Sequence, residues 1–168
     1  QQVGAAYNGD ITLLLDGNPD TWFEYENVVT TEIKEPLKLE LIINLGTEQV
    51  INHIRINPNN FGTKTVVNVD TIETSVDGEA YTSIKDDVFT SDVIEGEDDP
   101  FVLAASTSKF AGQGLYTFTP RKTKYVRLIL EQRELYVITT ASGDKLRYAI
   151  GIRDIEVSRR KYLVKGEL

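Results

Sequence analysis

Oxygen-bearing side chains gather in one short stretch near the N-terminus. The loop 16–21 carries carboxylate, amide and hydroxyl groups on Asp16, Asn18, Asp20 and Thr21. Oxygens of these kinds suit a calcium ion, which takes roughly six to eight of them. The same composition is also typical of a turn stabilised by its own side chains, because Asn and Asp accept hydrogen bonds from nearby backbone amides. Both interpretations are open from the residues alone.

Groups that could perform catalysis are sparse. The chain of 168 residues contains no Cys and a single histidine, His53. No nucleophile is placed beside it, and its position next to Ile54 on an alternating strand predicts that it faces solvent. Paired carboxylates are the other route, but the acidic run 86–99 falls in an expected loop, where fixed geometry is hard to hold. We therefore expect that the protein is not an enzyme.

The elements that must position these groups are short strands. Val, Ile, Thr and Tyr alternate with polar residues in runs broken by Gly, Asn, Asp and Pro, which predicts strands and turns. Residues 8–15 fit a strand or one helical turn, Asp77 and Gly78 mark a turn, and Trp22 is expected in the core. No long amphipathic helix is evident, so we predict an all-β sandwich or barrel. The expected strands are 37–43, 51–56, 71–76, 81–84, 115–118, 125–130 and 152–157.

Composition limits the classes of partner. The net charge of −8 argues against binding nucleic acid, and against attachment to anionic membranes by charge alone. No apolar run is long enough to span a membrane, and no signal peptide opens the sequence. Met is absent even at position 1, so we expect a piece of a longer protein or a processed product. Residues 86–114 are expected to form a long acidic loop, or a flap with a little strand of its own.

Four segments in order carry a resemblance to a known family. They are Asp-Gly-Asn-Pro-Asp-Thr-Trp at 16–22; Leu-Glu-Leu-Ile-Ile-Asn-Leu-Gly at 39–46, running on through 51–56; Glu-Thr-Ser-Val-Asp-Gly-Glu-Ala-Tyr at 73–81; and Lys-Tyr-Val-Arg-Leu at 124–128, closed by Ile-Arg-Asp-Ile-Glu-Val at 152–157. Together they resemble the discoidin family, also called coagulation-factor type C or galactose-binding-like domains. The sequence departs from the family pattern at Thr21 and Trp22, which are adjacent instead of separated by one residue.

The resemblance implies a fold, a domain organisation and a class of function. The fold is an antiparallel jelly-roll β-sandwich of about eight main strands, here spanning 1–158, followed by an extension or linker at 159–168. The function is non-catalytic binding that attaches a larger extracellular protein or assembly to a carbohydrate or other cell-surface ligand. The resemblance also implies a structural calcium ion, with Asp16, Asn18, Asp20, Thr21 and the late Glu156 as candidate ligands.

The resemblance implies that sugar is bound by loops that combine an aromatic platform with planar polar donors. The loop after the second expected strand offers Phe61 as a platform, with Asn59, Asn60 and Lys64 as donors and Arg55 just before it. The connection 132–148 is a second candidate. Its proposed ligand residues are Tyr136, Arg147 and Tyr148.

A second function stays open beside carbohydrate binding. The stretch Tyr-Ala-Ile-Gly-Ile-Arg-Asp at 148–154 resembles versions found in bacteriophage virion proteins. The domain would then be a structural module that contacts other subunits of a virion or tail-like assembly and binds no sugar. Few platform aromatics and a long acidic segment favour this alternative.

Overall fold

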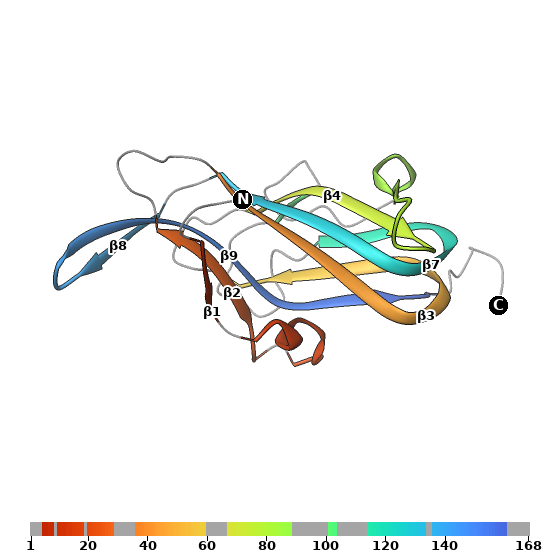
Figure 1. Ribbon diagram of the computed structural model, residues 1–168, viewed down its shortest axis with the longest axis horizontal. Coiled ribbons are helices and arrows are strands. Elements are labelled where there is room, and N and C mark those ends of the chain that lie inside the picture. The colour runs from red at the N-terminus through yellow and green to blue at the C-terminus, as the bar shows by residue number, and fades with distance from the viewer. Residues whose placement is uncertain are drawn as a thin grey trace, which may run out of the picture.

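A computed structural model describes residues 5–8, 10–18, 20–28, 36–59, 67–88, 101–103, 114–133 and 136–160. It contains nine strands and two short 3-10 helices within those ranges (Figure 1). The strands are β1 (Ala5–Asn8), β2 (Phe23–Val28), β3 (Leu37–Pro58), β4 (Val67–Ser75), β5 (Thr82–Ser83), β6 (Val102–Leu103), β7 (Gly114–Gln132), β8 (Tyr136–Thr140) and β9 (Gly143–Ser158). The helices are η1 (Ile11–Leu15) and η2 (Lys85–Asp87).

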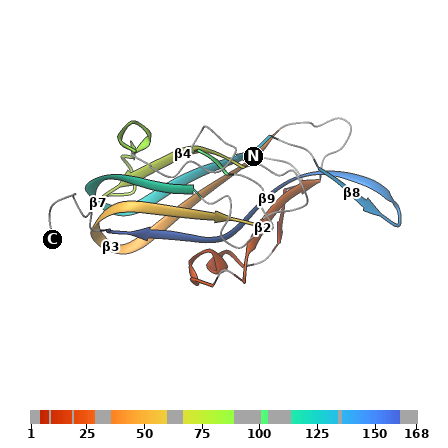
Figure 2. The same ribbon diagram turned by 180° about the vertical axis from the view of Figure 1, so that it is seen from behind.

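The two longest strands, β3 and β7, form an antiparallel ribbon that folds over on itself. Residues 37–44 of β3 pair with 125–132 of β7, residues 49–51 pair with 121–123, and residues 53–56 pair with 114–117, with a register shift between each stretch and the next. Both strands therefore turn back at the same end of the molecule, opposite the end that carries β8 (Figures 1 and 2). The fold-over divides the strands into two layers. One layer adds β4, β5 and β6, and the other adds β9, β2, β1 and β8.

The core lies between these layers, and period-two alternation produces it. In the first half of β3, Leu37, Leu39, Leu41 and Ile43 are buried while the residues between them are exposed. Each such side chain stabilises the fold by roughly 1.5–3 kcal/mol relative to leaving it in water. The predicted antiparallel β-sandwich is therefore confirmed. The predicted turn is also present, since Gly78 has a φ of 81°, which a residue without a Cβ adopts without strain.

Two predictions about single side chains are wrong. Trp22 lies at the surface with 42% of its area exposed, where its Nε1 donates a hydrogen bond to Glu24. His53 is buried with 3% exposed, although alternation placed it towards solvent. The second half of β3 lies between β7 and β9, and the backbone of Arg160 pairs with the side chain of Asn52 on its outer face. Simple alternation fails here: the β3–β7 pairing has a register shift between Ile51 and His53, and residues 51–54 are all buried.

The remaining segments bear on other expectations. Residues 11–15 adopt the short helical turn, and within the acidic segment 86–114 the pair Val102–Leu103 forms a small strand against β4. No helix in the described part of the chain is long and apolar enough to cross a membrane. Of the expected extension 159–168, residues 161–168 lie outside the described part, while the Arg160 backbone is held against β3.

Candidate functional site

The oxygen-bearing loop closes on itself through hydrogen bonds. Thr21 Oγ1 donates to Asp16 Oδ2 at 2.6 Å, and the amide of Asn18 donates to Asp16 Oδ1 at 2.8 Å. Thr21 Oγ1 also lies 3.0 Å from the carbonyl oxygen of Asn18, and the amide of Asp20 donates to Asn18 Oδ1. The hydrogen bond from Thr21, then that from Asn18, lowers the pKa of Asp16. The loop therefore brings an ionised carboxylate, a hydroxyl and a carbonyl together.

Glu156, the distant member of the predicted calcium set, is held by cations instead. Arg55 Nη2 lies 3.1 Å from Asp154 Oδ2 and 3.4 Å from Glu156 Oε2, and Arg160 Nη2 lies 3.5 Å from Glu156 Oε1. Burial raises the pKa of Glu156, but attraction to Arg55 and the hydrogen bonds outweigh burial and lower it overall. Glu156 and Gly17 line a common hollow of about 320 Å³.

The donor chemistry of the loop fits a calcium ion, whereas Glu156 is paired with Arg55 and Arg160. The oxygens of Asp16, Asn18 and Thr21 already lie within hydrogen-bond reach of one another. The Glu156 carboxylate faces the guanidinium of Arg55, which occupies the place of a cation beside it. Among the residues that the structure describes, no three His, Asp or Glu side chains cluster as metal ligands do. The calcium set of Asp16, Asn18, Asp20, Thr21 and Glu156 therefore stays a prediction, in which the first loop supplies most of the oxygens.

His53 lies two positions before Arg55 in β3 and is withdrawn from solvent. Its Nδ1 shares a hydrogen bond of 3.2 Å with Thr117 Oγ1, and its Nε2 is buried without a partner. Burial, followed by the positive charge of Arg160, lowers the pKa of His53 to about 4. The imidazole is therefore neutral near pH 7.

The predicted ligand residues fall in different environments. Asn59 is half-buried, and its backbone N–H donates a hydrogen bond to the carbonyl of Gly151 at 2.9 Å. Arg55 is paired with Asp154 and Glu156. Tyr148 is buried in the core with 4% exposed, so its ring is not a surface platform. Outside the described residues lie Asn60, Phe61 and Lys64, and the side chains of Tyr136 and Arg147 are not described either.

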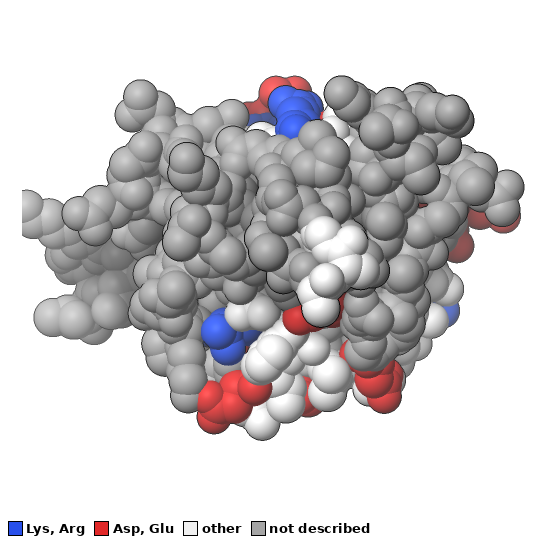
Figure 3. Space-filling model, turned by 90° about the vertical axis from the view of Figure 1, so that its left-hand side faces the viewer, with Lys and Arg blue, Asp and Glu red and all other residues white. Residues whose placement is uncertain are grey.

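Figure 3 views the end of the molecule towards which β8 extends. The coloured side chains there are of both signs, with acidic ones along the lower edge. The described side chains at this end form no uniform basic or acidic face. The opposite end carries the site that sequence reasoning missed.

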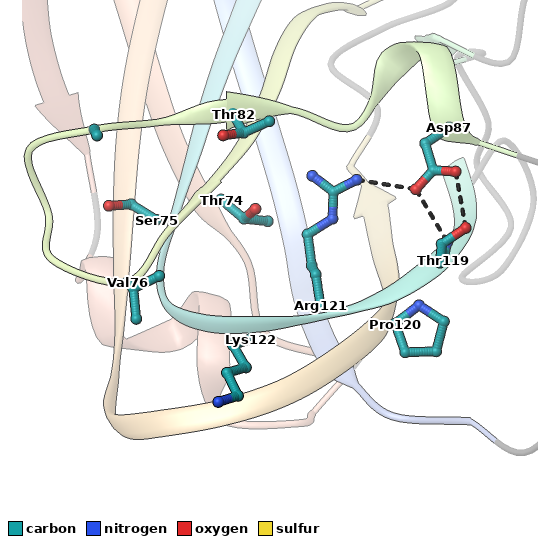
Figure 4. A pocket seen from close by; sticks show the side chains of 10 residues that line it. Thr74, Ser75, Val76, Thr82, Asp87, Thr119, Pro120, Arg121 and Lys122 are labelled. Carbon is teal, nitrogen blue, oxygen red and sulfur yellow. Dashed lines mark hydrogen bonds and ion pairs between the residues drawn. The ribbon is translucent and has the colours of Figure 1, made fainter.

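A pocket of about 380 Å³ opens at the end where β3 and β7 fold over. Its walls come from the end of β4, the turn that follows it, η2 and the bend of β7 (Figure 4). The lining residues are Thr74, Ser75, Val76, Ala80, Thr82, Asp87, Thr119, Pro120, Arg121 and Lys122. The lining thus combines four hydroxyl groups, a guanidinium, one carboxylate, an ammonium group and small apolar surfaces.

Arg121 is held in place on the wall of this pocket. Its Nη2 donates to Asp87 Oδ2 at 2.9 Å, and its guanidinium carbon lies 5.5 Å from the centroid of the Phe118 ring. Thr119 donates to the other oxygen of Asp87 from its hydroxyl at 2.9 Å. These hydrogen bonds, that of the Thr119 hydroxyl first, lower the pKa of Asp87 and keep the carboxylate charged.

Sequence reasoning missed this pocket because its parts are far apart in the chain. Arg121 and Asp87 are separated by 34 positions, and Asp87 belongs to the acidic segment that was expected to be a loop. The local signal is weak, since Thr-Pro-Arg-Lys at 119–122 is typical of an exposed bend. Only the pairing of β4 with β7 places Thr74 beside that bend.

Comparison with known proteins identifies the fold. No protein-family model and no curated protein match the chain. A pectin-binding carbohydrate-binding module matches with a TM-score of 0.50 and 18% identity, over 98% of this chain and 95% of that chain. The CBM32-1 module of a family 31 glycoside hydrolase from Clostridium perfringens matches with a TM-score of 0.50 and 16% identity, over 95% and 91%.

A third match places the same fold inside an enzyme. A GH29 fucosidase from Ruminococcus gnavus has a TM-score of 0.51 and 11% identity over 89% of this chain, but only 22% of that chain is covered. These likenesses show that the chain has the discoidin or galactose-binding-like fold, as its motifs predicted.

Proposed function

We propose that the chain is a non-catalytic carbohydrate-binding module, carried in an extracellular protein of greater length. The observation that carries the proposal is the pocket of about 380 Å³ at the folded end of the sandwich, where hydroxyl groups and a fixed guanidinium line a rigid wall of strands. Sugars are bound by such arrangements, in which planar polar groups contact hydroxyls and small apolar surfaces cover C–H faces. The shared fold with modules that bind pectin and other carbohydrates supports it.

Binding without catalysis agrees with the chemistry of the described groups. His53, the only histidine of the chain, is neutral, buried and hydrogen-bonded to Thr117, so it does not reach the pocket. Asp87 accepts hydrogen bonds from Thr119 and Arg121, so this carboxylate is tied to the wall. A carboxylate held in this way positions neighbouring groups and is poorly placed to exchange protons.

Two predicted features accompany the proposal. A calcium ion held by Asp16, Asn18, Asp20, Thr21 and Glu156 would stiffen the first loop, because it would draw their oxygens around one centre. The residues Asn60, Phe61 and Lys64, which lie outside the described part of the chain, remain candidate ligand contacts. The alternative function, contact between subunits of a virion or tail-like assembly, remains a prediction from the sequence.

A glycan-array screen of the purified domain tests the function. The array is probed in millimolar Ca²⁺ and again in chelator, with a heat-unfolded sample as the control. Binding to a defined sugar is the expected result, and binding that weakens in chelator would add support for calcium. If no glycan binds in either condition, and the domain self-associates in a way that soluble glycans do not alter, the proposal is refuted and the subunit-contact alternative is favoured.

A further inference from the structure

The pocket at the folded end has a charge that contrasts with the rest of the chain. Its charged lining residues are Arg121, Lys122 and Asp87, which leave one net positive charge in a protein whose net charge is −8. The Lys122 ammonium is at the exposed rim, 3.9 Å from Glu48. Each cation of the pocket thus has a carboxylate partner, so what favours an anionic ligand here is the orientation of Arg121 rather than an excess of positive charge.

The guanidinium of Arg121 is oriented before any ligand arrives. Asp87 holds one edge of it at 2.9 Å, and the Phe118 ring supports its face. Figure 4 shows the guanidinium between Asp87 on one side and Thr74 and Thr82 on the other, so a second edge points into the pocket. A planar guanidinium with a free edge matches the two oxygens of a carboxylate, and little side-chain entropy is lost when it is already fixed.

Hydroxyl groups face the same space. Thr74, at the end of β4, and Thr82, in β5, line the pocket beside Arg121. Neither hydroxyl forms a hydrogen bond with another residue in the described part of the chain. Each can donate one hydrogen bond and accept others, as a hydroxyl of a sugar ring requires. Pro120 and Val76 add small apolar surfaces to the lining.

We propose that this pocket binds a sugar residue that carries a carboxylate, a uronic acid. Arg121 pairs with the carboxylate, and Thr74 and Thr82 contact ring hydroxyls. This assignment rests on the proposed carbohydrate-binding function and adds to it the ligand class and the location. It places the ligand at the end of the sandwich opposite the end that carries β8 (Figure 1).

The test compares two forms of one ligand. Isothermal titration calorimetry measures binding of an oligogalacturonide and of the same oligosaccharide with its carboxylates methyl-esterified. The acid form is expected to bind at least about 10-fold more tightly, because a charge-assisted hydrogen-bonded pair contributes roughly 1.5–3 kcal/mol. Raising the salt concentration is expected to reduce the difference in affinity between the acid and the ester forms.

Three variants locate the contact. Arg121→Lys keeps the positive charge but lacks the two parallel N–H donors of the guanidinium. We expect this variant to lose most of the preference for the acid form. Thr82→Val, at an exposed position, is expected to weaken binding of both forms several-fold without unfolding the protein. Arg127→Gln is the matched control, because Arg127 also lies in β7 and pairs with Glu73 but does not line the pocket.

The outcomes separate this inference from the function on which it rests. Preference for the acid form that Arg121→Lys removes and Arg127→Gln preserves would support it. Equal binding of both forms, or a preference that survives Arg121→Lys, would overturn the uronic-acid assignment and leave carbohydrate binding in place. If neither form binds and the glycan array is also silent, the proposed function fails together with the inference.

Discussion

Acidification is expected to destabilise the protein through His53. Its pKa in the folded protein is about 4, against 6.5 for an unperturbed imidazole. Between these values the unfolded chain binds a proton that the folded protein does not, so stability is fully present above pH 6.5 and is lost as the pH falls towards 4. The full shift corresponds to about 3 kcal/mol, of which about 2 kcal/mol is lost by pH 5.

The cause of this loss is structural. A charged imidazole would be buried at 3% exposure, with Nε2 lacking a partner and with Arg160 and Arg55 as positive neighbours. Glu156 is the one group among these neighbours that favours the charged form, and its carboxylate is already paired with the two arginines. Desolvation and repulsion therefore outweigh the attraction.

Denaturant unfolding at pH 7.5 and pH 5.0 measures the effect, with His53→Gln as the control. Gln keeps a polar group next to Thr117 but does not titrate, so subtracting its pH dependence removes the contribution of the carboxylates. The wild type should lose about 2 kcal/mol more than the variant, or roughly 4–8 °C in Tm for a domain of this size. Parallel pH dependences of the two proteins would refute the reasoning.

Three further predictions follow from the same structure. Arg55→Met leaves the buried Asp154 without its cation and should cost about 3 kcal/mol in denaturant unfolding, whereas Lys122→Ala at an exposed pair should cost less than about 1 kcal/mol; similar losses would contradict the burial argument. Gly114→Ala places a new Cβ 2.8 Å from a buried leucine, so we expect a loss of roughly 1–3 kcal/mol by the same assay, and an unchanged midpoint would show that the strand relaxes freely. Millimolar Ca²⁺ should raise the Tm in differential scanning calorimetry by binding the folded loop, and Asp16→Asn should abolish the rise. A wild-type Tm that does not change with Ca²⁺ would refute the calcium prediction.

The sequence by itself determined the class of fold and its local elements. The alternation of Leu37, Leu39 and Leu41 with polar residues predicts a strand with one buried face, and the structure has it. The turn at Gly78 was also predictable, because its φ of 81° depends on the residue itself and not on distant contacts. Features of this kind are local, so nearby residues are enough to specify them.

Tertiary structure alone decided which side chains are buried or brought together. His53 is buried on a strand flanked by β7 and β9, and its hydrogen bond to Thr117 and its nearness to Arg160 involve residues far along the chain. Trp22 is exposed although its size and apolar ring favour the core. The pocket at Arg121 exists only because the β3–β7 ribbon folds over and brings Asp87 to it. Such contacts depend on strand pairing across the whole domain, and no local pattern specifies that pairing.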